Sequence, residues 1–222
     1  MSDKLPLFPL GTVLYPGVLL PLHIFEQRYR RLVGDLLDGP EPREFGVIAI
    51  RKGRETGIDG VSSLYEVGCT ARLRQVKELP DGRYELVTVG ARRFRLAALD
   101  ESAEYLQGTV DYLDEAPGDE AAASAAVSAV QRAFAGYVEA LAARSAGQIS
   151  LPELPGDPLA LSYLVAAAMI ADVPAKQALL AEPGALARLN AERSALARET
   201  TMLRSLTSAP AADLRYTPYS SN

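Results

Sequence analysis

The chain has 222 residues, 48% of them hydrophobic, and its 23 basic and 28 acidic residues give a net charge of −5. A chain of this length can bury roughly 70% of its unfolded surface in one large domain or two small ones. Cys69 is the only cysteine, which excludes an intrachain disulfide, and one histidine with one cysteine excludes the usual zinc sites. The N-terminus lacks the layout of a signal peptide and no apolar run approaches ~18 residues, so we expect a cytoplasmic protein that does not span a membrane. No metal or cofactor is predicted.

Prolines interrupt the start of the chain every few residues, between large apolar side chains in Leu5–Leu10 and Tyr15–Glu26. Because proline fixes φ and lacks an N–H donor, we predict short extended pieces here and neither a long helix nor a central strand. Spacings of three and four then predict an amphipathic helix that ends at Gly39-Pro40, with Tyr29, Leu32, Val33 and Leu36 on its apolar face.

Short strands are predicted up to about residue 116. The runs that read as strands are 45–50, 67–76, 84–89, 94–99 and 106–113. Asp81-Gly82, between two of these runs, is a strong hairpin signal. Several short strands with one early helix predict a closed or nearly closed barrel.

The period changes at Glu120, after which helices are predicted. One stripe along the first helix consists of Val127, Val130, Phe134, Tyr137 and Leu141. Asp157-Pro158 is expected to cap and start a second helix reaching about Asp172, followed by a short helix over 174–181.

The last predicted helix covers 183–206 and carries Leu189, Leu196 and Leu203 one heptad apart. Arg193 and Thr200 stand where a coiled coil needs apolar residues, so bundle packing is expected rather than a zipper dimer. We therefore predict a β domain over 1–116, a helical subdomain over 117–208 and a flexible tail over 209–222.

The run Pro-Leu-His-Ile-Phe-Glu-Gln-Arg-Tyr-Arg, residues 21–30, closely resembles the start of the N-terminal (LON) domain of ATP-dependent Lon proteases and of stand-alone proteins built from it. The resemblance continues through residues 45–48, 67–71, 79–84, 89–94, 175–180 and 187–189. It implies an α+β fold, with a PUA-like β pseudobarrel and one helix followed by a C-terminal helical bundle.

The chain contains no Gly-x4-Gly-Lys-[Ser/Thr] phosphate-binding loop, so neither ATP hydrolysis nor proteolysis is predicted. The resemblance implies instead a non-catalytic module that binds unfolded or extended polypeptides, as an adaptor or chaperone-like factor in protein quality control. Its expected partners include a protease or chaperone system, and its expected state is a monomer or weak homodimer.

An exposed apolar patch could hold an extended peptide, and a proline-interrupted strand edge could accept one as an added strand. The expected location is a groove between the barrel and the first long helix. The candidate protein-binding residues are Tyr15, Leu19, Phe134 and Tyr137.

The alternative is an RNA-binding PUA-like protein with a basic strand face made of Arg72, Arg74, Arg93 and Arg95. The acidic net charge and the lack of an aromatic series for base stacking count against nucleic acid. A solvated face of mixed charge is the simpler explanation.

Two further groups could carry chemistry. His23 with Glu26 could form a general base oriented by a carboxylate, and Cys69 could be a nucleophile. No nucleophile or metal set accompanies the first pair. Cys69 lies in an alternating strand, with Cys69, Ala71 and Leu73 on the inward face and Thr70, Arg72 and Arg74 on the other. We therefore expect a half-buried histidine that fixes the turn into the first helix, a buried structural thiol and no catalytic residue.

Overall fold

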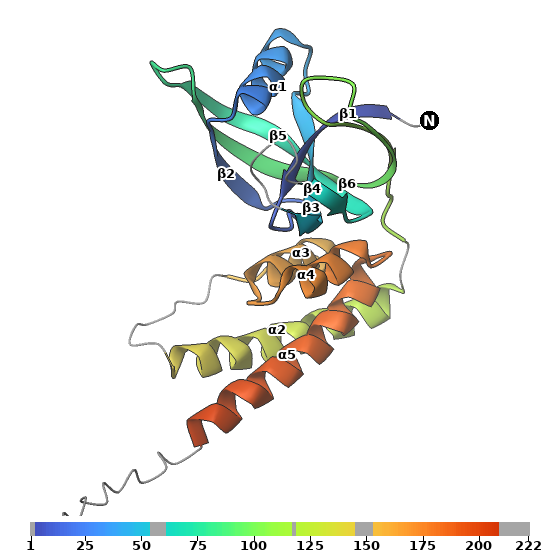
Figure 1. The fold of residues 1–222 in the computed structure, drawn as a ribbon. Helices are drawn as coiled ribbons and strands as arrows, with labels where there is room; N and C mark the ends of the chain where they lie inside the picture. Colours follow the sequence, from blue (N-terminus) through green and yellow to red (C-terminus); the bar gives the residue numbers. More distant parts are fainter. Residues whose placement is uncertain (1–2, 54–60, 117–118, 145–152, 209–222) are drawn as a thin grey trace, which may run out of the picture.

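The computed structural model describes residues 3–53, 61–116, 119–144 and 153–208. A β-barrel with one helix forms the N-terminal part, and a layer of helices lies against one side of it (Figure 1). The predicted α+β organisation is confirmed. None of the helices in these ranges is long and apolar enough to cross a membrane.

The barrel strands are β1 Asp3–Leu10, β2 Leu19–Ile24, β3 Glu44–Gly53, β4 Val61–Leu64, β5 Val67–Glu78, β6 Tyr84–Asp100 and β7 Gln107–Tyr112. Their order is β1-β7-β6-β5-β3-β4, and β1 also pairs in parallel with β3, which closes the barrel. Strand β2 lies outside this ring and pairs with the first half of β6.

Strand β1 differs from the expectation that no central strand runs through the prolines. It passes through both Pro6 and Pro9, and it belongs to the closed ring. Residues 3–6 pair with β7 and residues 7–10 pair with β3, so each half of β1 has one partner strand. A proline is tolerated where its nitrogen faces away from the paired side.

Strand β6 is a single strand of 17 residues where the sequence predicted two. Gly90 stands near its middle, and a Cβ at Gly90 would lie 2.1 Å from the carbonyl oxygen of Tyr15. The Gly90 amide donates to the Val18 carbonyl (2.9 Å), and the Gly90 carbonyl accepts from the Gly17 amide (2.8 Å). Glycine here lets the segment before β2 lie directly on β6 without interrupting the strand.

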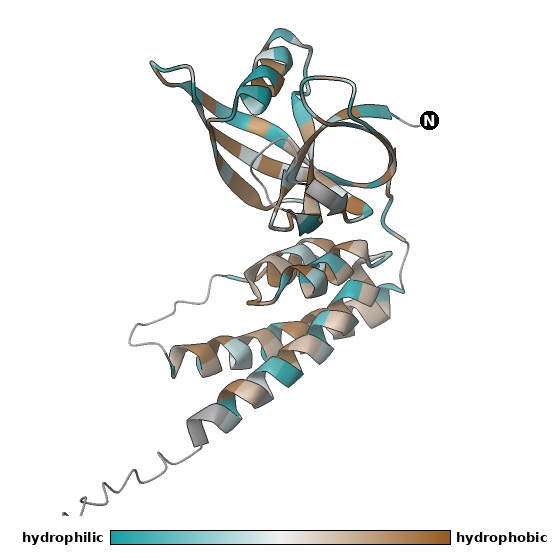
Figure 2. Cartoon of the chain, in the orientation of Figure 1, coloured by the Kyte–Doolittle hydropathy of each residue, from teal (hydrophilic) through white to brown (hydrophobic). Residues whose placement is uncertain are grey.

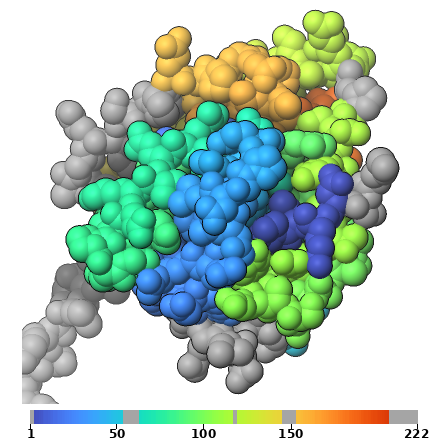
Figure 3. All heavy atoms as spheres, turned by 90° about the horizontal axis from the view of Figure 1, so that it is seen from above, coloured from blue at the N-terminus to red at the C-terminus, as the bar shows by residue number. Residues whose placement is uncertain are grey.

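Helix α1, Gln27–Asp38, buries Tyr29, Leu32 and Val33 as its spacing predicted. Seen from above, it lies between the β5–β6 hairpin and the segment that leads to β7 (Figure 3). The Tyr105 hydroxyl donates to the Asp35 carboxylate (3.0 Å), which ties that segment to the helix.

The C-terminal helices are α2 Glu120–Ala142, α3 Pro158–Ala168, α4 Val173–Ala181 and α5 Ala185–Ser208. The Asp157 side chain accepts from the Ala160 amide at the start of α3, as predicted. Helix α3 ends at Ala168, short of the predicted Asp172. The reason is that Met169 has extended backbone angles and Asp172 itself caps α4, accepting from the Ala175 amide.

Helix α5 packs against the other helices, as predicted from the interruption of its heptad pattern by Arg193 and Thr200. Leu189 and Leu196 are fully buried, and Leu203 is partly buried against the same core. Helices α3 and α4 lie between the barrel and the α2–α5 pair, and apolar residues are frequent in α3 in particular (Figure 1 and Figure 2).

The last strand ends at Tyr112 and α2 begins at Glu120, which agrees with the predicted change near residue 116. The two parts nevertheless share one hydrophobic cluster, which contains Tyr15 and Val67 of the barrel part beside residues of all four C-terminal helices. The division into two domains stays a prediction, and the predicted tail lies outside the described residues.

Candidate functional site

Three of the four candidate binding residues lie in the interior. Tyr15, Phe134 and Tyr137 are between 0% and 4% exposed, and the Tyr15 hydroxyl donates to the Lys176 carbonyl in α4 (2.7 Å). Helices α3 and α4 occupy the space where a groove between the barrel and α2 was expected (Figure 1). These three side chains stabilise the shared core and offer no accessible surface, whereas Leu19 is 64% exposed.

The four candidate arginines do not form one basic face. Arg93 is 2% exposed because α4 and the α4–α5 turn cover it, and its guanidinium donates to the Leu180 carbonyl (2.8 Å). The Arg72 guanidinium contacts the Glu44 carboxylate at 2.6 Å. Arg74 and Arg95 are exposed, but in the register Arg95 lies opposite Val67, at the other end of β5 from Arg74.

His23 and Glu26 do not contact each other as a dyad would. The Glu26 carboxylate is bonded by the Arg28 guanidinium (3.1 Å), and the exposed His23 ring lies beside Phe25 and is 3.4 Å from an Arg83 nitrogen. His23 is therefore more exposed than expected. Cys69 is fully buried, and burial raises the pKa of its thiol to about 12, so the reactive thiolate is disfavoured.

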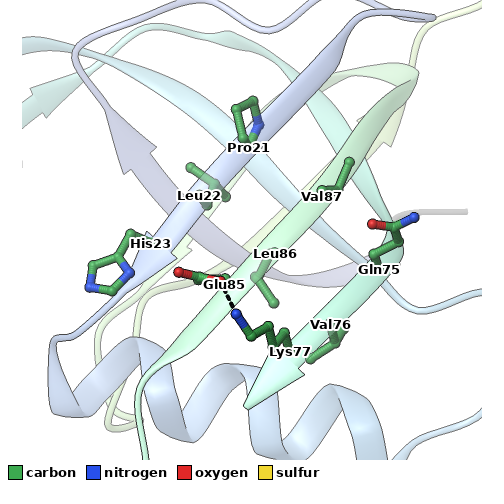
Figure 4. Close-up of a pocket in the computed structure, with 9 residues that line it drawn as sticks. All are labelled: Pro21, Leu22, His23, Gln75, Val76, Lys77, Glu85, Leu86 and Val87. Carbon is green, nitrogen blue, oxygen red and sulfur yellow. Dashed lines mark hydrogen bonds and ion pairs between the residues drawn. The ribbon is translucent and has the colours of Figure 1, made fainter. Parts of the chain in front are cut away.

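A groove of about 780 Å³ opens on the outer face of the sheet made by β2, β6 and β5 (Figure 4). Each of the three strands contributes a short run to it. The lining residues are Pro21, Leu22, His23, Gln75, Val76, Lys77, Glu85, Leu86 and Val87. The groove is broad and open, which suits a chain lying across it better than an enclosed small molecule.

The register places the outward side chains of this sheet in cross-strand pairs. Leu19 lies opposite Val89, Pro21 opposite Val87, and His23 opposite Glu85. Leu20, Leu22 and Ile24 alternate with these residues and pack toward the core under α1. The outer face thus carries an apolar strip, which we define as Leu19, Pro21, Val87 and Val89. Pro21 and Val87 line the groove, and the Leu19–Val89 pair adjoins it as the next outward pair along the same two strands.

Several charged groups around the apolar strip are paired with one another. The Lys77 ammonium contacts the Glu85 carboxylate at 3.1 Å, and the Arg83 guanidinium contacts the Asp81 carboxylate at 2.6 Å. Together with the Arg72–Glu44 pair, these contacts offset most of the charge beside the groove, where Arg74 is also exposed. The surface therefore favours apolar, uncharged segments over nucleic acid, which requires a dense positive field.

The free edge of β2 is poorly suited to strand addition. Within the described chain β2 pairs with β6 alone. In an antiparallel pair, alternate residues bond to the partner strand, and the Gly90–Val18 hydrogen bond shows which residues of β2 do so. The backbone groups of Leu19, Pro21 and His23 therefore point away from β6, toward the free edge. Pro21 stands at the centre of that edge and has no N–H to donate. The side chains of the face, rather than the backbone of the edge, are the available contact surface.

Sequence reasoning identified Leu19 and missed the rest of the apolar strip. The Asp81-Gly82 signal does fix the β5–β6 hairpin, but nothing local in Leu19–Ile24 shows that β2 joins β6 rather than another strand. No group of three or more metal-ligating side chains occurs among the described residues.

The sequence model of one protein family, described as the ATP-dependent protease La (LON) substrate-binding domain, matches residues 4–198 of this chain. The chain belongs to the LON substrate-binding domain family. The resemblance inferred from the sequence motifs is thereby confirmed.

Curated relatives and solved structures agree with this assignment. Lon protease 2 of Myxococcus xanthus is 29% identical over 92% of this chain, and Lon protease 2 of Syntrophobacter fumaroxidans is 27% identical over 85%. The chain spans 24% of the length of each of these relatives. The N-terminal domain of Lon protease from the Mycobacterium avium complex superposes with a TM-score of 0.64, at 17% identity and coverage of 90% of this chain and 98% of that one. A Lon N-terminal domain protein from Xanthomonas campestris superposes with a TM-score of 0.60, at 23% identity and coverage of 94% and 99%. These two structures support the fold.

Proposed function

We propose that this LON-domain chain binds unfolded or extended polypeptides without catalysing a reaction, and that the groove of β2, β6 and β5 is the contact surface. The observation that carries the proposal is the apolar strip, whose most exposed member, Leu19, adjoins the groove and is 64% exposed on a strand paired with β6. A large apolar side chain held in this way stabilises a complex when a client covers it. A role as an adaptor or chaperone-like factor in the cytoplasm is part of the same proposal.

The chemistry of the groove sets the affinity that we expect. Covering one exposed leucine contributes about 1.4 kcal/mol or somewhat more, which corresponds to about tenfold in Kd. Because the surrounding charges are paired, affinity should depend weakly on salt.

The test uses the full chain and a fluorescein-labelled, reduced and carboxymethylated α-lactalbumin as a permanently unfolded client, with anisotropy as the readout. Leu19→Ser should weaken binding about tenfold. Ile170→Ser is the matched control, because Ile170 is 68% exposed on the α3–α4 connection, outside the groove. Equal effects of the two substitutions, or no binding by the unsubstituted chain at high micromolar concentration, would refute the proposal.

A nucleic-acid outcome is distinguishable in the same assay. Association with a labelled RNA oligonucleotide that falls steeply with salt would favour the RNA-binding alternative.

A further inference from the structure

Glu192 is a carboxyl group buried at the junction between the barrel part and the helices. Its side chain is 0% exposed, and neither of its carboxyl oxygens has a hydrogen-bond partner among the described residues. It lies on α5 one turn after Arg188, in the middle of the shared hydrophobic cluster. An ionised carboxylate without a donor is one of the most costly groups that a protein interior can hold.

The polar groups around this junction are already bonded to other partners. The Tyr15 hydroxyl donates to the Lys176 carbonyl (2.7 Å), and the Tyr163 hydroxyl donates to the Glu115 carboxylate. The Arg188 guanidinium donates to the Leu179 carbonyl (3.0 Å) and the Ser162 hydroxyl (2.9 Å), and it reaches the Glu115 carboxylate at 3.5 Å.

Three further polar groups of the surrounding elements also have partners. Arg93 of β6 contacts Glu115 at 2.8 Å, the Lys176 ammonium of α4 donates to the Ala167 carbonyl (3.1 Å), and the Tyr137 hydroxyl of α2 accepts from the Ile170 amide (3.1 Å). Because none of these donors reaches Glu192 in this arrangement, an ionised Glu192 would need a rearranged side chain or water drawn into the core.

The electrostatics agree with this geometry. Burial raises the pKa of Glu192 to about 9, and the nearby Arg188 only partly offsets that rise. Burial, followed by the charge of Glu192, raises the pKa of the Tyr15 phenol, which places the two groups near each other across the junction. Burial also raises the pKa of Tyr163, so neither phenol ionises before Glu192 does.

We propose that Glu192 is a proton-linked latch of the barrel–helix junction. With its carboxyl neutral, α5 packs in the hydrophobic cluster that it shares with Tyr15, and loss of the proton loosens that cluster. Because the segment 13–18 leads directly into β2, the latch connects the helical part to the strand that carries Leu19.

The test measures hydrogen exchange of the full chain by mass spectrometry at pH 6.5 and pH 9.5, expressed as protection factors that remove the intrinsic pH dependence. Amides of 13–18 and 185–196 should lose protection at least tenfold at pH 9.5 in the unsubstituted chain. Glu192→Gln should keep their protection within twofold between the two pH values. Glu199→Gln, on the same helix but partly exposed, is the matched control and should behave like the unsubstituted chain.

A second measurement does not depend on the folding of any variant. The 13C carboxyl signal of Glu192 in the unsubstituted chain should show a neutral group at pH 7. A midpoint of its titration below pH 7, an equal loss of protection in Glu192→Gln, or unchanged protection at pH 9.5 in the unsubstituted chain would each overturn the latch.

Discussion

Gly90→Ala tests the close approach between β6 and the segment that leads into β2. The added Cβ would stand 2.1 Å from the Tyr15 carbonyl oxygen and 2.8 Å from its carbonyl carbon, where an ordinary contact needs well over 3 Å. Both of the atoms that it would meet belong to the backbone, so no rotamer change can relieve the overlap. The segment has to move away from β6.

The cost follows from what that movement breaks. Separating the two segments disrupts the Gly17–Gly90 and Gly90–Val18 hydrogen bonds, which contribute about 1 kcal/mol each. Steric strain and the disturbed packing of Tyr15 add about 1–3 kcal/mol. We therefore expect Gly90→Ala to lower the free energy of unfolding by about 3–5 kcal/mol.

Urea unfolding followed by circular dichroism measures this change, which should appear as a midpoint lower by roughly 1–2 M. Gly34→Ala provides the matched control, because Gly34 lies inside α1 with nothing within 4 Å of its would-be Cβ. Helix propensity should make that variant more stable by about 1 kcal/mol. If Gly90→Ala is as stable as the unsubstituted chain to within 1 kcal/mol, the proposed role of Gly90 is incorrect.

Three further predictions concern the junction and the free strand edge. Glu192→Gln should raise the free energy of unfolding, by an amount that grows with pH from about pH 4.5 upward. The reason is that the Glu192 carboxyl is held neutral in the folded state to about pH 9 but ionises near pH 4.5 in the unfolded state. The gain should reach on the order of 3 kcal/mol at pH 7 and vanish below pH 4.5 in thermal unfolding, and a gain independent of pH would contradict it. Glu115→Gln should cost about 2–4 kcal/mol in urea unfolding, since it removes the carboxylate shared by two buried guanidinium groups, those of Arg93 and Arg188. Pro21→Val should restore a donor at the free edge of β2 and increase self-association in sedimentation velocity, and a variant as monodisperse as the unsubstituted chain would argue against an edge-blocking role.

Features of the fold that depend on neighbouring residues could be predicted from the sequence, whereas features that depend on distant segments could not. Periodicity located α1 and the apolar stripe of α2, and the Asp157 cap located the start of α3. These features depend on residues within a few positions of one another. The continuity of β6 was missed because it depends on the contact of Gly90 with the distant Tyr15. The end of α3 was missed because Asp172 caps the next helix instead of ending α3.

The burial of side chains on the barrel strands shows the same difference between local and non-local information. Alternation on β5 predicted that Thr70 faces outward, yet Thr70 is fully buried and its hydroxyl accepts from the Arg92 amide (3.0 Å). Arg93 is likewise on an outward strand position, but α4 covers it. A strand pattern states which side chains share a face and does not state what covers that face.

The sequence alone determined the α+β class, the family, the barrel followed by helices and most of the helix boundaries, since periodicity, capping residues and prolines act over short distances. Only the tertiary structure decided which apolar residues form the accessible surface. Tyr15, Phe134 and Tyr137 are enclosed because α3 and α4 pack between the barrel and α2, whereas Leu19 stays exposed because β2 lies outside the closed ring. The physical reason is that exposure is set by the sum of contacts from distant segments, which no local pattern contains.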